Sequence, residues 1–199
     1  MQENLWLIPV FPVLGAVING FFGRWTGNRW AGPIACIASG LSFIFASWVF
    51  FGLLNLDPSA RSIHHTLYTW IASGDFVIKA SFLLDPLSAV MILVVTGVGF
   101  AIHVYSIGYM HGDPCQTRYF AYLNLFMFAM SLLVLADNFF LMFVGWEGVG
   151  LCSYLLIGFW FEKKSASDAG KKAFIVNRIG DFGFAIAIFL LFSTLGTLD

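Results

Sequence analysis

Three ionisable residues lie inside long apolar segments of this 199-residue chain. Glu147 is near the centre of an apolar run of roughly 23 residues that extends from Asn138 to Trp160. The next apolar segment carries Arg178 and Asp181. A charge at the centre of a bilayer costs about 2.5–3.5 kcal/mol on insertion scales, and intramembrane charges usually mark an ion or proton path. The three residues therefore predict such a path.

Glu147 is flanked by glycines in the run Gly145-Trp-Glu-Gly-Val-Gly150. Glycine lets the backbone of a neighbouring helix come close and leaves room for water. Desolvation favours a protonated acid, whereas a nearby cation favours the carboxylate. We therefore expect Glu147 to meet a cation from another helix and to exchange a proton. The alternative is a purely structural ion pair or hydrogen-bonded acid.

Arg178 and Asp181 are three residues apart, so they share one face of a helix. Lys171 lies two turns before Arg178 on the same face. This stripe predicts a polar path from the inner surface to the middle of the membrane; an Arg–Asp pair that only docks the helix is the alternative. His103 is a hydrogen-bonded packing residue in one interpretation and a proton relay in the other.

Composition assigns the chain to the membrane proteins. Hydrophobic residues make up 59% of the chain and charged residues 11%, whereas soluble domains are near 25% charged. There is no basic tail and no phosphate-binding glycine loop, so we expect no nucleic-acid partner. Cys36, Cys115 and Cys152 form no CxxC motif, and the four histidines form no ligand cluster. We therefore expect no iron–sulfur cluster, haem or zinc on this chain.

Six segments are long and apolar enough to cross a bilayer, which takes about 20 residues. They comprise residues 5–22, 30–54, 86–110, 117–136, 138–160 and 168–195. The expected fold is therefore an all-α polytopic membrane protein with about six transmembrane helices. The N-terminus lacks the basic region of a signal peptide, so we expect the first segment to be a retained helix.

The lysines and arginines of the loops predict the orientation, because they collect on the inner side of a membrane. The loops after the first, third and fifth spans hold seven of them: Arg24, Arg29, Arg118, Lys163, Lys164, Lys171 and Lys172. The opposite side holds only Arg61 and Lys79. We therefore expect the N-terminus outside. Contact with anionic lipid is a second interpretation of the lysine cluster.

The longest loop, residues 55–85, is then external. It contains two β-rich runs on either side of Ser73-Gly-Asp75, a pattern that predicts a β-hairpin. A disordered loop is the alternative.

A series of motifs follows in order along nearly the whole chain. They are Leu84-Asp-Pro-Leu-Ser-Ala-Val-Met91, His103-Val-Tyr-Ser-Ile-Gly-Tyr-Met110, Arg118-Tyr-Phe120, Ala136-Asp-Asn-Phe139, Gly145-Trp-Glu-Gly-Val-Gly-Leu-Cys-Ser-Tyr-Leu-Leu-Ile-Gly-Phe-Trp160 and Asn177-Arg-Ile-Gly-Asp-Phe182. Together they resemble the N-terminal region of the largest antiporter-like subunit of respiratory complex I, called subunit L in bacteria and chain 5 in mitochondria. The Trp146–Tyr154 run is more similar to this subunit than to its two paralogues in the complex.

The resemblance implies the N-terminal part of an antiporter-like fold, whose proton unit is built from two inverted five-helix repeats. Residues 1–111 would be an N-terminal membrane region, and residues 112–199 the start of the proton-translocating domain. In the family, a glutamate on the fifth helix pairs with a lysine on a broken seventh helix. Glu147 matches that glutamate, and Arg178 and Asp181 match charged positions of the sixth helix. The lysine would lie beyond Asp199, so we expect Glu147 to lack a cationic partner here.

The implied function is proton translocation coupled to electron transfer from NADH to quinone. The resemblance places no redox centre on this chain, because NADH, FMN, iron–sulfur clusters and quinone belong to partner subunits. The implied partners are other membrane and peripheral subunits, the lipid bilayer and protons, in a bacterial inner membrane or an equivalent energy-coupling membrane. Two alternatives stay open: the large subunit of a multisubunit sodium/proton antiporter, and a structural membrane subunit that does not pump.

Overall fold

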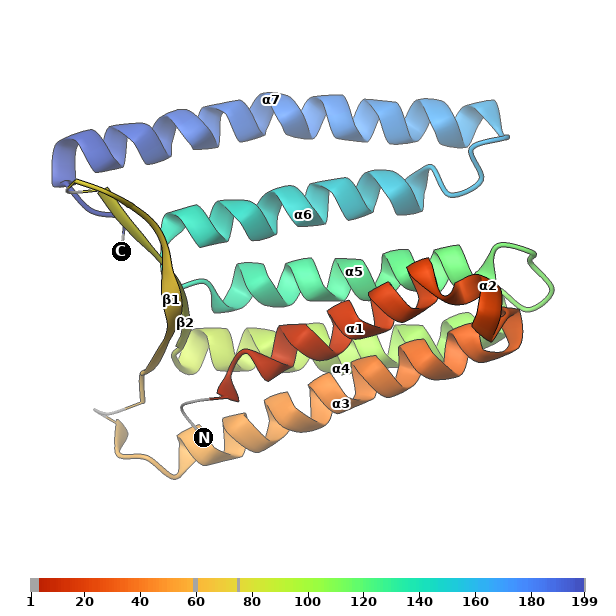
Figure 1. Ribbon diagram of the computed structural model, residues 1–199, viewed down its shortest axis with the longest axis horizontal. Coiled ribbons are helices and arrows are strands. Elements are labelled where there is room, and N and C mark those ends of the chain that lie inside the picture. The colour runs from red at the N-terminus through yellow and green to blue at the C-terminus, as the bar shows by residue number, and fades with distance from the viewer. Residues whose placement is uncertain (1–3, 59–60, 75, 199) are drawn as a thin grey trace.

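Apolar helices run side by side, with a β-hairpin across one end of the bundle (Figure 1). The computed structural model describes residues 4–58, 61–74 and 76–198. The helices are α1 (Leu7–Phe21), α2 (Gly23–Thr26), α3 (Asn28–Leu54), α4 (Pro86–Tyr109), α5 (Gln116–Leu135), α6 (Phe139–Ile157) and α7 (Lys164–Leu195). The strands are β1 (Ile63–Ser73) and β2 (Phe76–Leu84).

Five of these helices, α3 to α7, are long and apolar enough to cross a membrane. This confirms the helical membrane fold. The first expected span differs, because α1 has only 15 residues, or about 22 Å of helix, whereas a bilayer core is about 30 Å thick. The helix ends at Phe21, and the chain then turns through α2. Gly27, at φ 72°, makes the turn into α3, and this positive φ favours a residue without a side chain.

The hairpin expected in the loop is confirmed. Strands β1 and β2 pair antiparallel from Ile63 opposite Leu84 to Ser73 opposite Phe76. Gly74 has φ 59° at the turn, a conformation that glycine adopts at no steric cost. Asp75, the last residue of the predicted turn, lies outside the described residues.

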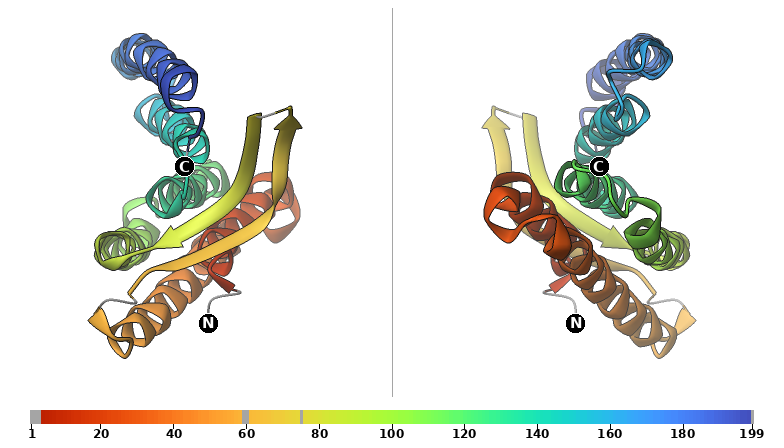
Figure 2. Two further views of the ribbon diagram at one scale, coloured as in Figure 1. Left: turned by 90° about the vertical axis from the view of Figure 1, so that its left-hand side faces the viewer. Right: turned by 90° about the vertical axis from the view of Figure 1, so that its right-hand side faces the viewer.

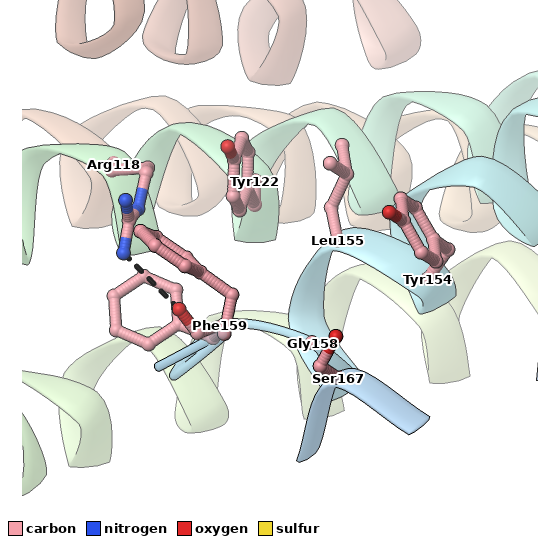
Figure 3. A pocket seen from close by; sticks show the side chains of 8 residues that line it. Arg118, Tyr122, Tyr154, Leu155, Gly158, Phe159 and Ser167 are labelled. Atoms are coloured by element: carbon pink, nitrogen blue, oxygen red, sulfur yellow. Dashed lines mark hydrogen bonds between the residues drawn. The ribbon is translucent and has the colours of Figure 1, made fainter. Parts of the chain in front are cut away.

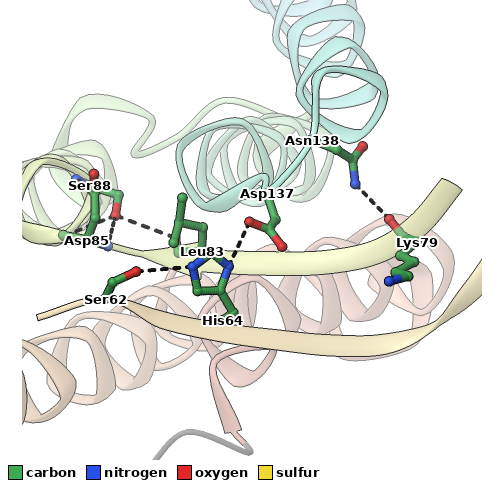
Figure 4. A network of polar contacts seen from close by, with 8 residues as sticks. All are labelled: Ser62, His64, Lys79, Leu83, Asp85, Ser88, Asp137 and Asn138. Atoms are coloured by element: carbon green, nitrogen blue, oxygen red, sulfur yellow. Dashed lines mark hydrogen bonds and ion pairs between the residues drawn. The ribbon is translucent and has the colours of Figure 1, made fainter. Parts of the chain in front are cut away.

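Polar contacts fasten the hairpin to the junction between α5 and α6 (Figure 4). His64 Nδ1 lies 3.1 Å from Asp137 Oδ1, and the Asn138 amide donates to the Lys79 carbonyl at 2.8 Å. The Asp137 N–H donates to the Ser81 carbonyl at 3.2 Å. The bond to Ser81 satisfies a backbone N–H between the two helices, and all three contacts join the strands to this end of the bundle.

The main apolar core lies at the hairpin end of the bundle. It joins residues of α1, α3, α4 and both strands, including Ile8, Val49, Phe82 and Ile92. Helix α6 packs between α5 and α7, and the three form a row (Figures 1 and 2). Most of the apolar surface of α7 is exposed. This row positions the intramembrane charges.

Candidate functional site

Glycines bring α6 onto α5 beside Glu147. A Cβ built on Gly145 would lie 2.6 Å from the Leu133 backbone nitrogen, and one on Gly148 would lie 2.9 Å from the Cβ of Ala129. Only glycine permits an approach this close. The prediction of close helix packing is therefore confirmed for these two glycines, and their partner is α5. Glu147 itself makes its contact on the other side, with α7.

Arg178 pairs with both intramembrane acids. Its Nη1 forms an ion pair with Glu147 Oε2, and its Nε lies 3.9 Å from Asp181 Oδ2. The guanidinium also lies 4.8 Å from the ring centroid of Phe174, within the range of a cation–π contact. The prediction that Arg178 and Asp181 share a face is confirmed.

The expectation that Glu147 meets a cation from another helix is confirmed, and the expectation drawn from the resemblance, that it lacks a cationic partner here, is wrong. Helix α7 packs along α6, and an arginine side chain is long enough to reach from one helix to the other. Sequence spacing relates residues of one helix only. It therefore placed Arg178 beside Asp181 but could not predict the contact between Arg178 and Glu147 on the neighbouring helix.

Trp146 is a member of this site that the sequence analysis missed. Its indole Nε1 donates to Asp181 Oδ1 at 2.8 Å, and its ring packs edge-on against Phe184. The Asp181 side chain is only 8% exposed, so this bond supplies a donor to a nearly buried carboxylate. The available signal was a tryptophan in the interior of a span, where its N–H needs an acceptor.

These contacts make one cluster across the α6–α7 contact, with Trp146 and Glu147 on α6 facing Arg178 and Asp181 on α7. One guanidinium lies between two carboxylates. A proton added to Glu147 would remove the charge that holds Arg178 there, and Asp181 would remain as the anion nearest to Arg178. A change in the charge of either acid would therefore change the interactions that hold the arginine in place.

Two other predicted residues lie apart from this cluster. Lys171 is exposed, two turns before Arg178 on α7, and within the described residues no hydrogen bond or ion pair joins it to the cluster. His103 is buried on α4, where its Nδ1 bonds the Gly99 carbonyl at 2.7 Å. Helices α5 and α6 separate α4 from α7 (Figure 1).

In the described part of the chain, no group of three or more His, Cys, Asp or Glu side chains is placed to hold a metal ion. The site thus consists of one arginine, two acids and one indole on apolar helices. This fold and this site define a polytopic membrane protein with a cluster of charges between two of its helices.

Comparison with known proteins gives the family. Residues 70–120 match the family model of the NADH-ubiquinone oxidoreductase (complex I) chain 5 N-terminus. Residues 136–199 match that of the NADH:quinone oxidoreductase/Mrp antiporter transmembrane region. The chain belongs to the subunit L, or chain 5, family of complex I.

Curated relatives agree over almost the entire chain. The NADH-quinone oxidoreductase subunit L of Mycobacterium tuberculosis (strain H37Rv) is 48% identical over 98% of this chain and 30% of its own length. That of Escherichia coli (strain K12) is 45% identical over 100% of this chain and 32% of its own length. NADH-ubiquinone oxidoreductase chain 5 of Chondrus crispus is 44% identical over 97% of this chain and 28% of its own length. The chain thus spans about a third of the length of these relatives.

Solved structures show the same arrangement of helices. A chain of the Mrp complex from Dietzia sp. DQ12-45-1b superposes with a TM-score of 0.81 at 25% identity, over 98% of this chain and 20% of that chain. A chain of the membrane-bound sulfane sulfur reductase, an archaeal respiratory membrane complex, gives a TM-score of 0.80 at 20% identity. The match covers 100% of this chain and 39% of that chain. The second likeness concerns the fold alone.

Proposed function

We propose that this chain forms part of a proton-translocating membrane subunit of an NADH:quinone oxidoreductase. The single observation that carries the proposal is the cluster in which Arg178 lies between Glu147 and Asp181. The family membership supports the choice of complex, because the curated relatives are subunits of that enzyme by name.

Each charged residue has a role in this proposal. Glu147 holds and releases the proton, Arg178 is the cation that responds to its charge, and Asp181 is the second anion. Lys171 lies at the entrance, because it is exposed near the start of the helix that carries the other two. His103 remains a predicted relay, and the proposal does not depend on it.

The remaining parts of the proposal concern the assembly. Residues 112–199 form the beginning of the proton-translocating domain, and residues 1–111 the membrane region before it. The redox cofactors NADH, FMN, iron–sulfur clusters and quinone bind to partner subunits. The complex lies in a bacterial inner membrane or an equivalent membrane, with the N-terminus of this chain outside.

Glu147→Gln in the full-length subunit tests the proposal. The amide keeps the size of the side chain, and a neutral amide costs less to bury than a carboxylate, so the complex should assemble. Proton pumping should fall at least about tenfold, because positioned proton-transfer groups contribute that much or more. Asp181→Asn should have a weaker effect, since Arg178 keeps one of its two anions. Protons moved per quinone reduced are measured in reconstituted complex; wild-type stoichiometry in Glu147→Gln would leave only a structural ion pair.

The second candidate is the large subunit of a multisubunit sodium/proton antiporter. Its support is the TM-score of 0.81 with a chain of the Mrp complex. Purification of the full-length protein separates the two candidates. Flavin and iron–sulfur subunits that purify with it support the oxidoreductase, and their absence together with sodium-dependent proton exchange supports the antiporter.

A further inference from the structure

A second polar site lies away from the acid–arginine cluster, in a pocket of about 230 Å³. It is bounded by the first turns of α5, the last turns of α6 and the start of α7 (Figure 3). Its polar lining residues are Arg118, Tyr122, Tyr154 and Ser167. Tyr154 is seven residues beyond Glu147 on α6, which is about 10 Å along the helix. The pocket is therefore a separate site.

The Arg118 guanidinium uses only some of its hydrogen-bond donors within the described residues. Its Nη2 donates to the Phe159 carbonyl at 3.1 Å, and among the residues that the structure describes its buried Nε has no hydrogen-bond partner. The rings of Phe159 and Phe161 lie 4.7 Å and 5.2 Å from the guanidinium carbon. Within the described part of the chain, no carboxylate oxygen lies within 4.0 Å of this side chain. A partly buried guanidinium with five donors favours an anion with several acceptor oxygens.

The position of the pocket along the helices indicates which kind of anion it would bind. Arg118 is the third residue of α5 and Ser167 the fourth residue of α7, so both lie at helix ends. The ends of helices this long lie at the level of the lipid headgroups. Four lysines lie at the same end: Lys163, Lys164, Lys171 and Lys172. Basic pockets between transmembrane helices at this depth suit anionic headgroups, and arginine binds phosphate oxygens in pairs.

We propose that this pocket binds the phosphate of an anionic phospholipid, with Arg118 as the cation that anchors it. The hydroxyls of Tyr122, Tyr154 and Ser167 are further hydrogen-bond donors within the lining. The proposal does not rest on the proton-translocating function, because it concerns different residues and a different ligand.

The test counts the lipids that the full-length subunit keeps in its complex. Wild-type complex in nanodiscs of phosphatidylglycerol and phosphatidylcholine is examined by native mass spectrometry after mild delipidation. Arg118→Gln should lose about one retained phosphatidylglycerol per complex. Arg29→Gln is the matched control, because Arg29 is an exposed arginine at the start of α3 that lines a different pocket at the same end. It should keep the wild-type number.

Ser167→Asp is a second variant that leaves Arg118 in place. Its carboxylate would occupy the pocket as an internal anion, so it too should lose the lipid, and it decides the question if Arg118→Gln fails to assemble. Added inorganic phosphate should not displace the lipid; displacement would identify free phosphate as the ligand and overturn the proposal. Equal retention in wild type and variants, or equal retention of phosphatidylcholine, would also overturn it.

Discussion

Among the described residues, Arg178 forms ion pairs with two acids, whereas Asp181 accepts its side-chain hydrogen bond from Trp146. Arg178 forms its ion pair with Glu147, whereas its Nε stays 3.9 Å from Asp181. The Trp146 indole, which donates to Asp181 at 2.8 Å, is therefore closer to that carboxylate than the arginine is. Hydrogen bonds to charged groups contribute about 1.5–3 kcal/mol. Trp146 thus fixes the orientation in which Asp181 faces the arginine.

Trp146→Phe should lower the turnover of the assembled complex by up to about tenfold while the KM for quinone stays unchanged, because it removes one donor to a charged group and keeps an aromatic ring against Phe184. Quinone reductase kinetics per assembled complex measure this. Trp160→Phe is the control, since that indole donates to Asp113 in an exposed loop.

In an Asp181→Ala background, which leaves no side-chain acceptor for the indole, Trp146→Phe should have no further effect. If both single variants lower pumping and the double variant is worse by the sum of their effects, the indole acts independently of Asp181. Trp146 would then be a packing residue, while the role of Glu147 would be unaffected.

Helix packing depends on the positions at which each helix can approach the next. Gly145 brings α6 against the backbone of α5 at Leu133, and this contact sets the rotation at which Glu147 faces α7. Asp85 fixes the start of α4 in a reciprocal capping box with Ser88. The close contact at Gly145 and the capping box at Asp85 each depend on one residue, so a single substitution can test each of them.

Gly145→Ala should reduce the amount of assembled complex, because its Cβ would lie 2.6 Å from a backbone nitrogen that has no room to move. Gly150→Ala on the same helix is the control, as a Cβ there would have no atom of the described residues within 4 Å. That variant should be neutral or should stabilise the helix by up to about 1 kcal/mol. Blue-native electrophoresis compares the two, and normal assembly of Gly145→Ala would contradict the packing described.

Asp85 should contribute a pH-dependent part of the stability of α4. The hydrogen bond from the Ser88 N–H to the carboxylate is the main cause that lowers the pKa of Asp85 below its ordinary value. A lowered folded-state pKa stabilises the fold above the unfolded value, near 3.9, and this stabilisation is lost as pH falls through the folded value.

Asp85→Asn keeps an N-cap acceptor and should flatten the dependence of the melting temperature on pH below about pH 4. Asp85→Ala should lower stability by about 1 kcal/mol at neutral pH, because it removes the cap. Thermal melts of the purified subunit at several pH values measure both effects. A slope unchanged in Asp85→Asn would show that the cap contributes nothing to it.

The two ends of the bundle differ in composition. The hairpin, the start of α1 and the end of α7 lie at one end, and the turns between α4 and α5 and between α6 and α7 lie at the other (Figure 1). The lysine cluster therefore collects at a single end. This arrangement fits the alternation of spans on which the predicted orientation rests.

Cys115 should react with an impermeant thiol reagent in inside-out vesicles and not in intact spheroplasts. It lies in the turn before α5, free and partly exposed, whereas Cys152 is buried. Cys115→Ser removes the signal and serves as the control. Labelling from the outside alone would reverse the orientation and the direction of the proposed path from Lys171 to Asp181.

The sequence alone determined the class, the hairpin and the charged residues, because each depends on local composition or on spacing within one element. Length and hydropathy define spans, a glycine turn between β-rich runs predicts a hairpin, and a spacing of three places Arg178 beside Asp181. Only the tertiary structure decided which side chains of different helices contact one another. It brought Arg178 to Glu147, Trp146 to Asp181 and Arg118 to the end of α6. Those contacts join different helices, and they follow from how α5, α6 and α7 pack, which no periodicity within a single helix encodes.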